Sequence, residues 1–371
     1  MKTIVHVLPY MATGGTEKHV LTLCRRQRDH YDVLLLAPPG EILPEFQKLG
    51  IGYVDFPELT GNVIRKVALF KRKLREIDRD RGVDIVHVHA AHEFVRFSRK
   101  ALPDTPILFH LSAHQGTSLS KAFNYWQSAR ISRKHADLLI AVSEEEKRIV
   151  TSKGFPEKRV RVVYNGYEQS EGDDDAKIAE LKERHGLTGC LVIGNLGRIH
   201  KTKRLDVLIE AFAKLKADAG REPETKLLLI GDGPDRRNLE DLVKKLKLQN
   251  DVHFTGFIPR GDRVLRVLDI FVLPTTFEGC SNVLVEVMAK GLPIVTTDVP
   301  SVAWMFEDGE NALLFRTNNA VELCKKLRKI IIDPRLKRDL AQGALKNFVS
   351  NFKAEDMARK IDEIYQSILL R

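Results

Sequence analysis

"TIVHVLPYMATGGTEKHVLTL", residues 3–23, contains the pattern on which the fold depends. Its first residues form an apolar run typical of a buried strand, and an amphipathic helix is expected from about Thr16. Between the two, Gly14 and Gly15 permit a tight turn and a close approach of the backbone to a ligand. The N-terminus of a helix offers free N–H groups to an anion, so this turn is a candidate phosphate contact. A turn that merely needs glycine is the alternative.

The strand-and-helix pattern of this stretch recurs along the chain. Further apolar runs, each followed by a longer segment, lie at residues 31–39, 84–90, 106–111, 137–143, 190–197, 225–233, 251–257, 269–275 and 292–298. Continuous apolar strands that alternate with helices indicate parallel sheets covered on both faces. A Gly/Ser-rich and acidic segment at 165–177 interrupts the pattern. We therefore predict an α/β protein with two Rossmann-like, doubly wound domains facing across a cleft.

Composition and charge narrow the class of protein. The chain has 371 residues, a net charge of +10 that lies mostly in its first half, and four scattered cysteines. The cysteines have neither zinc nor disulfide spacing, and no apolar stretch is long enough for a signal peptide or a membrane span. We expect a cytoplasmic protein. No zinc finger, RRM signature or basic-aromatic stripe is present, so no nucleic-acid partner is predicted.

The segment 61–82 is a basic amphipathic stretch with apolar residues at helical spacing. A helix of this kind can lie on an anionic membrane surface, which would make the protein peripheral on the inner face of a membrane. The alternative is a helix that covers a sheet and exposes a solvated basic face. The sequence leaves both interpretations open.

Two loops carry candidate phosphate ligands. In residues 194–212 a strand ends at Leu196, and Arg198 and Lys203 precede a helix that begins near Leu205. Two fixed cations beside a loop suit a diphosphate, although a solvated cationic loop would look the same. Residues 231–237, "GDGPDRR", lack the third glycine of the dinucleotide fingerprint, which argues against an oxidoreductase.

The stretch 277–297 holds two glutamates, Glu278 in a loop and Glu286 inside a helix. Ser281 or Asn282 is suited to cap that helix. A phosphate at the helix N-terminus would have one carboxylate on each side, and carboxylates accept hydrogen bonds from vicinal hydroxyls. The spacing therefore suits a nucleotide-sugar site, with Glu286 on the ribose and Glu278 on the transferred sugar. A partly buried helix glutamate with a local partner and an ordinary loop acid are the alternatives.

Histidines crowd the stretch 87–93, "HVHAAHE". On a strand His87 and His89 share a face, whereas His92 does not follow them. The apparent metal spacing is therefore not expected to form a metal site.

With these motifs in place, the sequence resembles the family-4 retaining glycosyltransferases (glycosyl transferases group 1) of the GT-B fold, nearly from end to end. "GGTEKHV" is similar to their first glycine loop, "LGRIHKTKRLDVLIEAF" to their Arg-x4-Lys segment, and "EGCSNVLVEVMAKGLPIVTTD" to their Glu-x7-Glu signature. The resemblance implies an acceptor-side domain at 1–168, a donor-side domain at 169–350, and a C-terminal helix at 351–371 that packs back across the domains.

The resemblance also implies roles for individual residues. Catalytic roles would fall to His110, at a strand end where His114 is the competitor, and to Arg198, Lys203 and Glu278. The implied donor-binding residues are Gly14, Gly15, Gly197, Gly231, Ile258, Gly279, Cys280, Ser281, Asn282, Val283 and Glu286. One departure concerns the loop after residue 298, where Pro300 and Ser301 replace the usual glycines and Trp304 the usual glutamate.

The implied activity is transfer of a sugar, with retention, from a nucleotide-diphosphate sugar to an acceptor hydroxyl. A UDP-sugar is the expected donor, and the acceptor would be a growing glycan or lipid-linked saccharide in cell-surface polysaccharide, lipopolysaccharide or glycolipid synthesis. Arg198 and Lys203 would stabilise the leaving diphosphate, so neither a metal nor another cofactor is expected. A GT-B nucleotide-sugar epimerase and a non-catalytic nucleotide-sugar-binding module are the alternatives.

Overall fold

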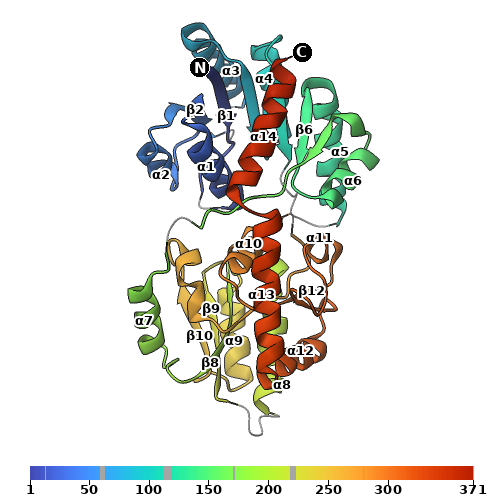
Figure 1. Ribbon diagram of the computed structural model, residues 1–371. Coiled ribbons are helices and arrows are strands. Elements are labelled where there is room, and N and C mark those ends of the chain that lie inside the picture. Colours follow the sequence, from blue (N-terminus) through green and yellow to red (C-terminus); the bar gives the residue numbers. More distant parts are fainter. Residues whose placement is uncertain are drawn as a thin grey trace. The chain divides into compact units, whose positions relative to one another are not determined.

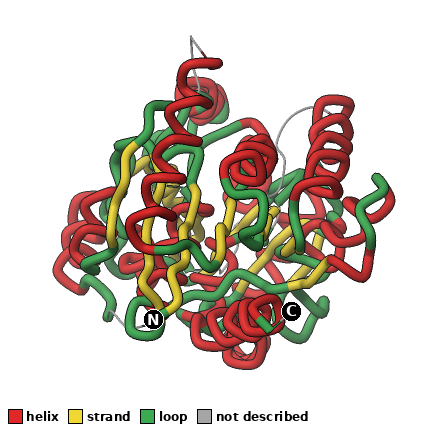
Figure 2. The backbone as a smooth tube through the Cα atoms, turned by 90° about the horizontal axis from the view of Figure 1, so that it is seen from above, coloured by secondary structure: helices red, strands yellow, loops and turns green. Residues whose placement is uncertain are grey.

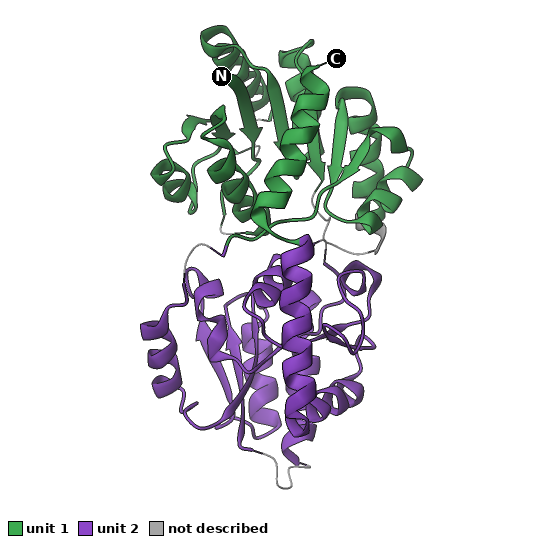
Figure 3. Ribbon diagram, viewed as in Figure 1, with its two compact units in different colours: residues 1–168, 352–371 green, residues 169–351 purple. Residues whose placement is uncertain are grey.

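The protein's structure, a computed structural model, describes residues 1–370 except 13, 59–62, 112–117, 170–171, 218–222 and 279. The chain forms two compact units, which are described separately (Figure 3). Unit 1 comprises residues 1–168 together with 352–371, and unit 2 comprises residues 169–351. Both termini therefore belong to unit 1. In the part of the chain that is described, no helix has the length and apolar character needed to cross a membrane.

Unit 1 is built on a seven-stranded parallel sheet with strand order β3-β2-β1-β4-β5-β6-β7. Figure 1 labels β1, β2 and β6 of this sheet among the helices that flank it. The strands of unit 1 are β1 Lys2–Val7, β2 Tyr31–Ala37, β3 Gly52–Asp55, β4 Ile85–His89, β5 Ile107–Leu111, β6 Leu138–Ala141 and β7 Val160–Val162. Its helices are α1 Gly15–Gln27, α2 Leu43–Lys48, α3 Val63–Arg81, α4 His92–Ala101, α5 Ser118–His135, α6 Glu144–Ser152, the short η1 Glu157–Arg159 and the C-terminal α14 Ala354–Leu369.

The sheet of unit 1 separates two apolar cores. Because strand side chains alternate between faces, Ile4 joins one core and Val5 the other. The first core includes side chains from α1, α2 and α14, and the second includes side chains from α3, α4, α5 and α6. Strands buried on both faces explain the uninterrupted apolar runs in the sequence.

Unit 2 repeats the architecture with a six-stranded parallel sheet of order β10-β9-β8-β11-β12-β13. Figure 2 shows strands in yellow with helices in red around them. The strands of unit 2 are β8 Leu191–Leu196, β9 Thr225–Ile230, β10 Val252–Gly256, β11 Ile270–Leu273, β12 Ile294–Thr297 and β13 Leu313–Phe315. Its helices are α7 Asp175–Arg184, η2 Lys201–Lys203, α8 Leu205–Ala217, α9 Arg236–Lys245, η3 Gly261–Val267, α10 Asn282–Ala289, α11 Pro300–Ala303, α12 Ala320–Ile332 and α13 Pro334–Asn351. The predicted fold class, with two doubly wound parallel-sheet units, is confirmed.

Three strands lie outside the apolar runs that the sequence singles out: β3, β7 and β13. Each is an outer strand of its sheet. Edge strands pair on one side only, so they are short and need fewer apolar residues than central strands. Their weak apolar signal explains why periodicity alone does not reveal them.

The strand order reverses once in each sheet, between β1 and β4 in unit 1 and between β8 and β11 in unit 2. At such a switch point the connections leave in opposite directions, and ligands of open α/β sheets bind beside the carboxyl ends of the strands there. The glycine loop after β1 and the Arg198 loop after β8 both lie at these ends.

Candidate functional site

Two glycine-containing loops of unit 2 pass each other too closely for side chains. The Gly197 N–H donates to the carbonyl of Ile230 at 2.9 Å, and the Ile199 N–H donates to the carbonyl of Asp232 at 2.9 Å. A Cβ atom on Gly231 would lie 2.0 Å from the carbonyl oxygen of Gly197, and Gly231 has a φ of +136°. Only glycine fits there. The contact holds the backbone that leads from β8 to Arg198.

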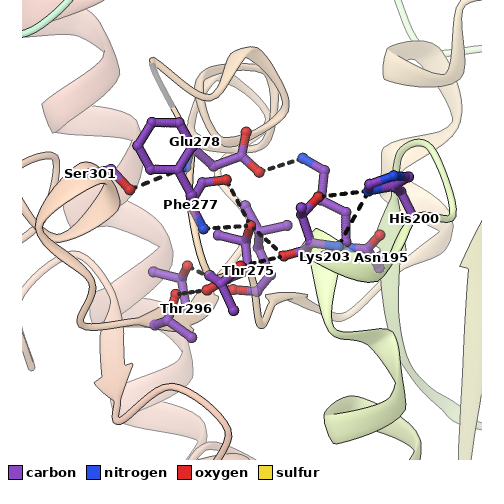
Figure 4. A network of polar contacts seen from close by, with 12 residues as sticks. Asn195, His200, Lys203, Thr275, Phe277, Glu278, Thr296 and Ser301 are labelled. Carbon is purple, nitrogen blue, oxygen red and sulfur yellow. Dashed lines mark hydrogen bonds and ion pairs between the residues drawn. The ribbon is translucent and has the colours of Figure 1, made fainter. Parts of the chain in front are cut away.

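Lys203 and Glu278, which are 75 residues apart in sequence, form an ion pair in unit 2 (Figure 4). Lys203 ends the turn after β8, and Glu278 lies in the loop after β11. The two side chains are mostly buried, with 21% and 14% of their surfaces exposed. The pair therefore joins the two strand ends that flank the switch point of this sheet.

Backbone and hydroxyl hydrogen bonds hold the same two loops in register. The Thr202 carbonyl accepts from the Thr276 N–H at 2.9 Å and from the Thr275 hydroxyl at 3.1 Å. The Glu278 N–H donates to the Ser301 hydroxyl at 3.1 Å, and the Trp304 indole N–H donates to the Ser301 carbonyl at 3.1 Å. The residues that depart from the family's usual glycine and glutamate thus position the loop of Glu278.

Helix α10 presents the remaining candidate donor ligands of unit 2. Glu286 lies inside it and is 5% exposed, and Ser281 is its N-cap. The Ser281 hydroxyl has no hydrogen-bond partner among the described residues. It therefore does not accept from the backbone N–H groups in the first turn of α10. Of the other predicted residues, Cys280 is buried, Asn282 and Val283 are half-buried, and Gly279 lies outside the described residues.

Arg198 and Ile258 are the last predicted residues of this unit. Arg198 is exposed and makes no hydrogen bond or ion pair with any described residue. Ile258 is half-buried next to the exposed Phe257, in the segment after β10. An unpaired guanidinium in the loop that leads from β8 to Lys203 leaves a cation available to an anionic ligand.

In unit 1, Gly14 is the N-cap of α1 and Gly15 its first residue. A Cβ atom on Gly14 would lie 2.7 Å from Oε2 of Glu17, a carboxyl group that is 1% exposed. Burial raises the pKa of Glu17 to about 7, although the backbone N–H groups of Glu17 and Ala12 oppose the shift. The glycine turn therefore carries a buried acid beside the N-terminus of α1.

His110, the candidate sugar contact, lies on β5 and is 2% exposed. Its ring packs against His19 of α1 with centroids 4.4 Å apart. Burial, followed by the effect of His19 and His6, holds the pKa of His110 well below its ordinary value. His110 is therefore neutral at pH 7 and can donate from one ring nitrogen and accept at the other. The competing His114 lies outside the described residues.

The sequence did not reveal that His110 lies among four other buried histidines. His6, His19, His87 and His89 are also buried, and burial lowers the pKa of His6 to about 4 and that of His19 to about 3. The strand register places His6 beside His87 and His89 beside His110. The spacing of His87 and His89 on one strand face indicates part of this histidine cluster. The presence of His19 from α1 depends on tertiary packing and cannot be read from the sequence.

Two doubly wound parallel-sheet α/β units in one chain are the architecture of the GT-B class of glycosyltransferases. Family comparisons agree with the geometry: "Glycosyltransferase Family 4" matches residues 13–171 and "Glycosyl transferases group 1" matches residues 177–347. The two matches account for most of the chain. The chain belongs to the family-4, group 1 glycosyltransferases.

Individual proteins are similar at lower identity. N-acetyl-alpha-D-glucosaminyl L-malate synthase of Bacillus anthracis is 24% identical over 302 residues, which cover 80% of this chain and 78% of that protein. N-acetylgalactosamine-N,N'-diacetylbacillosaminyl-diphospho-undecaprenol 4-alpha-N-acetylgalactosaminyltransferase of Campylobacter jejuni is 24% identical over 371 residues, 95% and 94% of the two chains. The crystal structure of Anabaena HepE with UDP-glucose superposes with a TM-score of 0.86 at 20% identity, over 99% of this chain and 100% of that one. The structural likeness shows the fold.

Proposed function

We propose that this glycosyltransferase moves a sugar from a UDP-sugar to a hydroxyl of a growing glycan or lipid-linked saccharide, with retention of the anomeric configuration. The pathway would be cell-surface polysaccharide, lipopolysaccharide or glycolipid synthesis. The observation that carries the proposal is the ion pair of Lys203 and Glu278 beside the N-terminus of α10, with Glu286 inside that helix. The UDP-glucose of the similar HepE structure and the diphospho-undecaprenol substrate named for the Campylobacter relative support the choice of donor and acceptor.

The donor diphosphate would be bound by charges that unit 2 already presents. An ammonium has three donors and a carboxylate two acceptor oxygens, so Lys203 and Glu278 can each bind a ligand while they remain paired. Lys203 and Arg198 would bind the diphosphate, and Glu278 would accept a hydrogen bond from a hydroxyl of the transferred sugar. Glu286 would accept from the ribose hydroxyls, and backbone groups at Gly231 and Ile258 would flank the base.

Retention would follow from attack on the same face from which the diphosphate leaves. The bond from the anomeric carbon to the diphosphate oxygen breaks, and the acceptor oxygen bonds to that carbon. A leaving phosphate oxygen takes the acceptor's proton. Charge on the departing diphosphate would be stabilised by Arg198, Lys203 and the N-terminus of α10, an arrangement that needs no metal at the phosphates.

Unit 1 would supply the acceptor side. Neutral His110 can donate a hydrogen bond to a sugar hydroxyl, and Gly15 at the start of α1 permits a close backbone approach. The segment 61–82 would contact an anionic membrane surface. In α3 the apolar residues Val63 and Ile64 are 45% and 85% exposed, whereas Phe70 and later core residues of the helix are buried.

A thermal-shift screen against UDP, GDP, ADP and their sugar conjugates tests the donor assignment. We expect a rise in melting temperature with UDP ligands, because a ligand that binds only the folded state stabilises it. Arg198→Ala should lose most of the shift, whereas the matched control Arg338→Ala, an exposed arginine on α13, should keep it. No shift at millimolar ligand would favour a binding module of another kind. Conversion of a UDP-sugar to its epimer without an acceptor would favour the epimerase.

A further inference from the structure

Five buried histidines meet at the carboxyl end of the sheet in unit 1. His6 lies on β1, His87 and His89 on β4, His110 on β5 and His19 on α1, and none is more than 4% exposed. Neighbouring rings have centroids 4.2–6.1 Å apart. So many buried imidazoles need partners for their nitrogens, since an unsatisfied polar atom in a protein interior is costly.

A chain of hydrogen bonds fixes the tautomer of His89. The Gln27 amide nitrogen donates to a carboxylate oxygen of Asp362 on α14 at 3.2 Å, which turns the amide oxygen toward His6. This oxygen accepts from Nε2–H of His6 at 3.1 Å, so Nδ1 of His6 carries a lone pair and accepts from Nε2–H of His89 at 2.9 Å. Nδ1 of His89 is left with a lone pair and has no partner among the described residues.

The ring nitrogens of His19 and His110 also lack partners: neither nitrogen of either side chain has a hydrogen-bond partner among the described residues. His19, His89 and His110 each offer a ring nitrogen, and these three atoms lie within 4.8 Å of one another. Each neutral ring has one nitrogen with a lone pair, so the three side chains can together supply the ligand set of a metal ion, for which imidazole is the commonest protein ligand.

We propose that His19, His89 and His110 bind a divalent late first-row transition-metal ion, with Zn²⁺ as the representative. A tetrahedral ion with three imidazole nitrogens at about 2.0–2.1 Å places them about 3.4 Å apart, so the rings need to close by about 1.4 Å at most. Asp362, Gln27 and His6 form the outer chain that orients His89, as carboxylates and carbonyl groups commonly do behind a metal-bound imidazole. The ion would keep one open position.

The neighbouring triad of His6, His87 and His89 is less suited to an ion. Both nitrogens of His6 take part in hydrogen bonds, and Nδ1 of His87 shares a hydrogen bond of 2.7 Å with the Tyr365 hydroxyl. Because both triads use His89, they provide one site and not two. An ion at the proposed site would occupy a nitrogen of His110, so it would compete with the sugar contact proposed for that residue.

Metal binding is measured without reference to activity. Untagged protein, freed of metal with a chelator, is titrated with Zn²⁺ against a chromophoric competitor, and X-ray absorption of the loaded protein gives its ligands. We expect one Zn²⁺ per chain and nitrogen ligands at about 2.0–2.1 Å. No stoichiometric binding, or a sulfur ligand at about 2.3 Å, would overturn the proposal. This measurement on the native chain holds whether or not a variant folds.

Variants assign the site to its residues. His19→Gln and His110→Gln should each weaken Zn²⁺ binding by more than about 100-fold, and Gln27→Met, which breaks the orienting chain between Asp362 and His6, by about 10–100-fold. His30→Gln, an exposed histidine just after α1, should bind as the native chain does. Unchanged affinity in the folded His19 and His110 variants, or a loss in the His30 variant, would place the ion elsewhere and overturn the assignment.

Discussion

The carboxyl group of Glu146 should make the stability of unit 1 depend on pH. Glu146 lies in the first turn of α6, where its N–H donates to the N-cap hydroxyl of Ser143 at 3.1 Å. Its carboxylate accepts from the Val142 N–H at 3.2 Å and the Tyr125 hydroxyl at 3.3 Å. Burial nevertheless dominates and raises the pKa of Glu146 from 4.5 to about 7.

The sign follows from where the proton is held. Between about pH 4.5 and 7 the folded state keeps the proton on Glu146 and the unfolded state loses it, so stability falls as the pH rises. A shift of this size lowers the free energy of unfolding by about 3 kcal/mol. This loss is complete above pH 7 and absent below pH 4.5. Glu146→Gln preserves the shape and an acceptor for the Val142 N–H but cannot ionise. The variant's stability relative to the native chain should therefore rise by about 3 kcal/mol across this window.

Urea unfolding at pH 4.5, 5.5, 6.5 and 7.5 measures this difference. The chain has two tryptophans, Trp126 in unit 1 and Trp304 in unit 2, so a Trp304→Phe background confines the fluorescence signal to the unit that contains Glu146. The matched control is Glu144→Gln, at an exposed position of the same helix. If the stability of Glu146→Gln and that of the native chain changed with pH in parallel, the burial argument would be refuted. The pH effect of the buried acid Glu17 is the same in both proteins and drops out of this difference.

Three further predictions concern unit 2. Glu286→Gln should lower turnover with a UDP-sugar by about 10–100-fold through loss of a charge-assisted hydrogen bond. The control Glu210→Gln, at an exposed position, should keep its turnover, and steady-state kinetics measure both variants. Lys203→Met should abolish the UDP-induced thermal shift, and a retained shift would remove Lys203 from the diphosphate site. Gly231→Ala should destabilise unit 2 by about 1–3 kcal/mol in urea because its Cβ meets the Gly197 carbonyl, whereas Gly172→Ala, with no atom within 4 Å, should be neutral.

The central strands of both sheets could be predicted because they are buried on two faces and their apolar runs are continuous. The edge strands β3, β7 and β13 could not, since a strand paired on one side has little apolar pattern to read. Arg198, Lys203, Glu278 and Glu286 could be singled out by residue type and by the family's spacing. The direct pairing of Lys203 with Glu278 depends on β8 and β11 being neighbours in the sheet.

The role of Ser301 could not be predicted either. In sequence it replaces a glycine of the family pattern, yet its hydroxyl accepts from the Glu278 N–H, and its carbonyl accepts from the Trp304 indole. The serine hydroxyl, which a glycine lacks, adds a hydrogen bond that holds the candidate catalytic loop, whereas the bond to the backbone carbonyl depends on the indole of Trp304. Such compensation is a property of side chains in space and leaves no periodic signal in the sequence.

The two switch points carry opposite chemistry on the same architecture. Beside β8 and β11 the loops present charged groups, the exposed Arg198 and the mostly buried Lys203–Glu278 pair. Beside β1 and β4 the side chains are neutral imidazoles, whose pKa values are lowered by burial. Fixed charges suit a diphosphate, whose charge grows as it leaves. Neutral imidazoles suit hydroxyl groups or a metal ion, because they offer lone pairs without repelling a cation. The division of chemistry between the units therefore follows from which residue types the sequence places at the ends of the central strands.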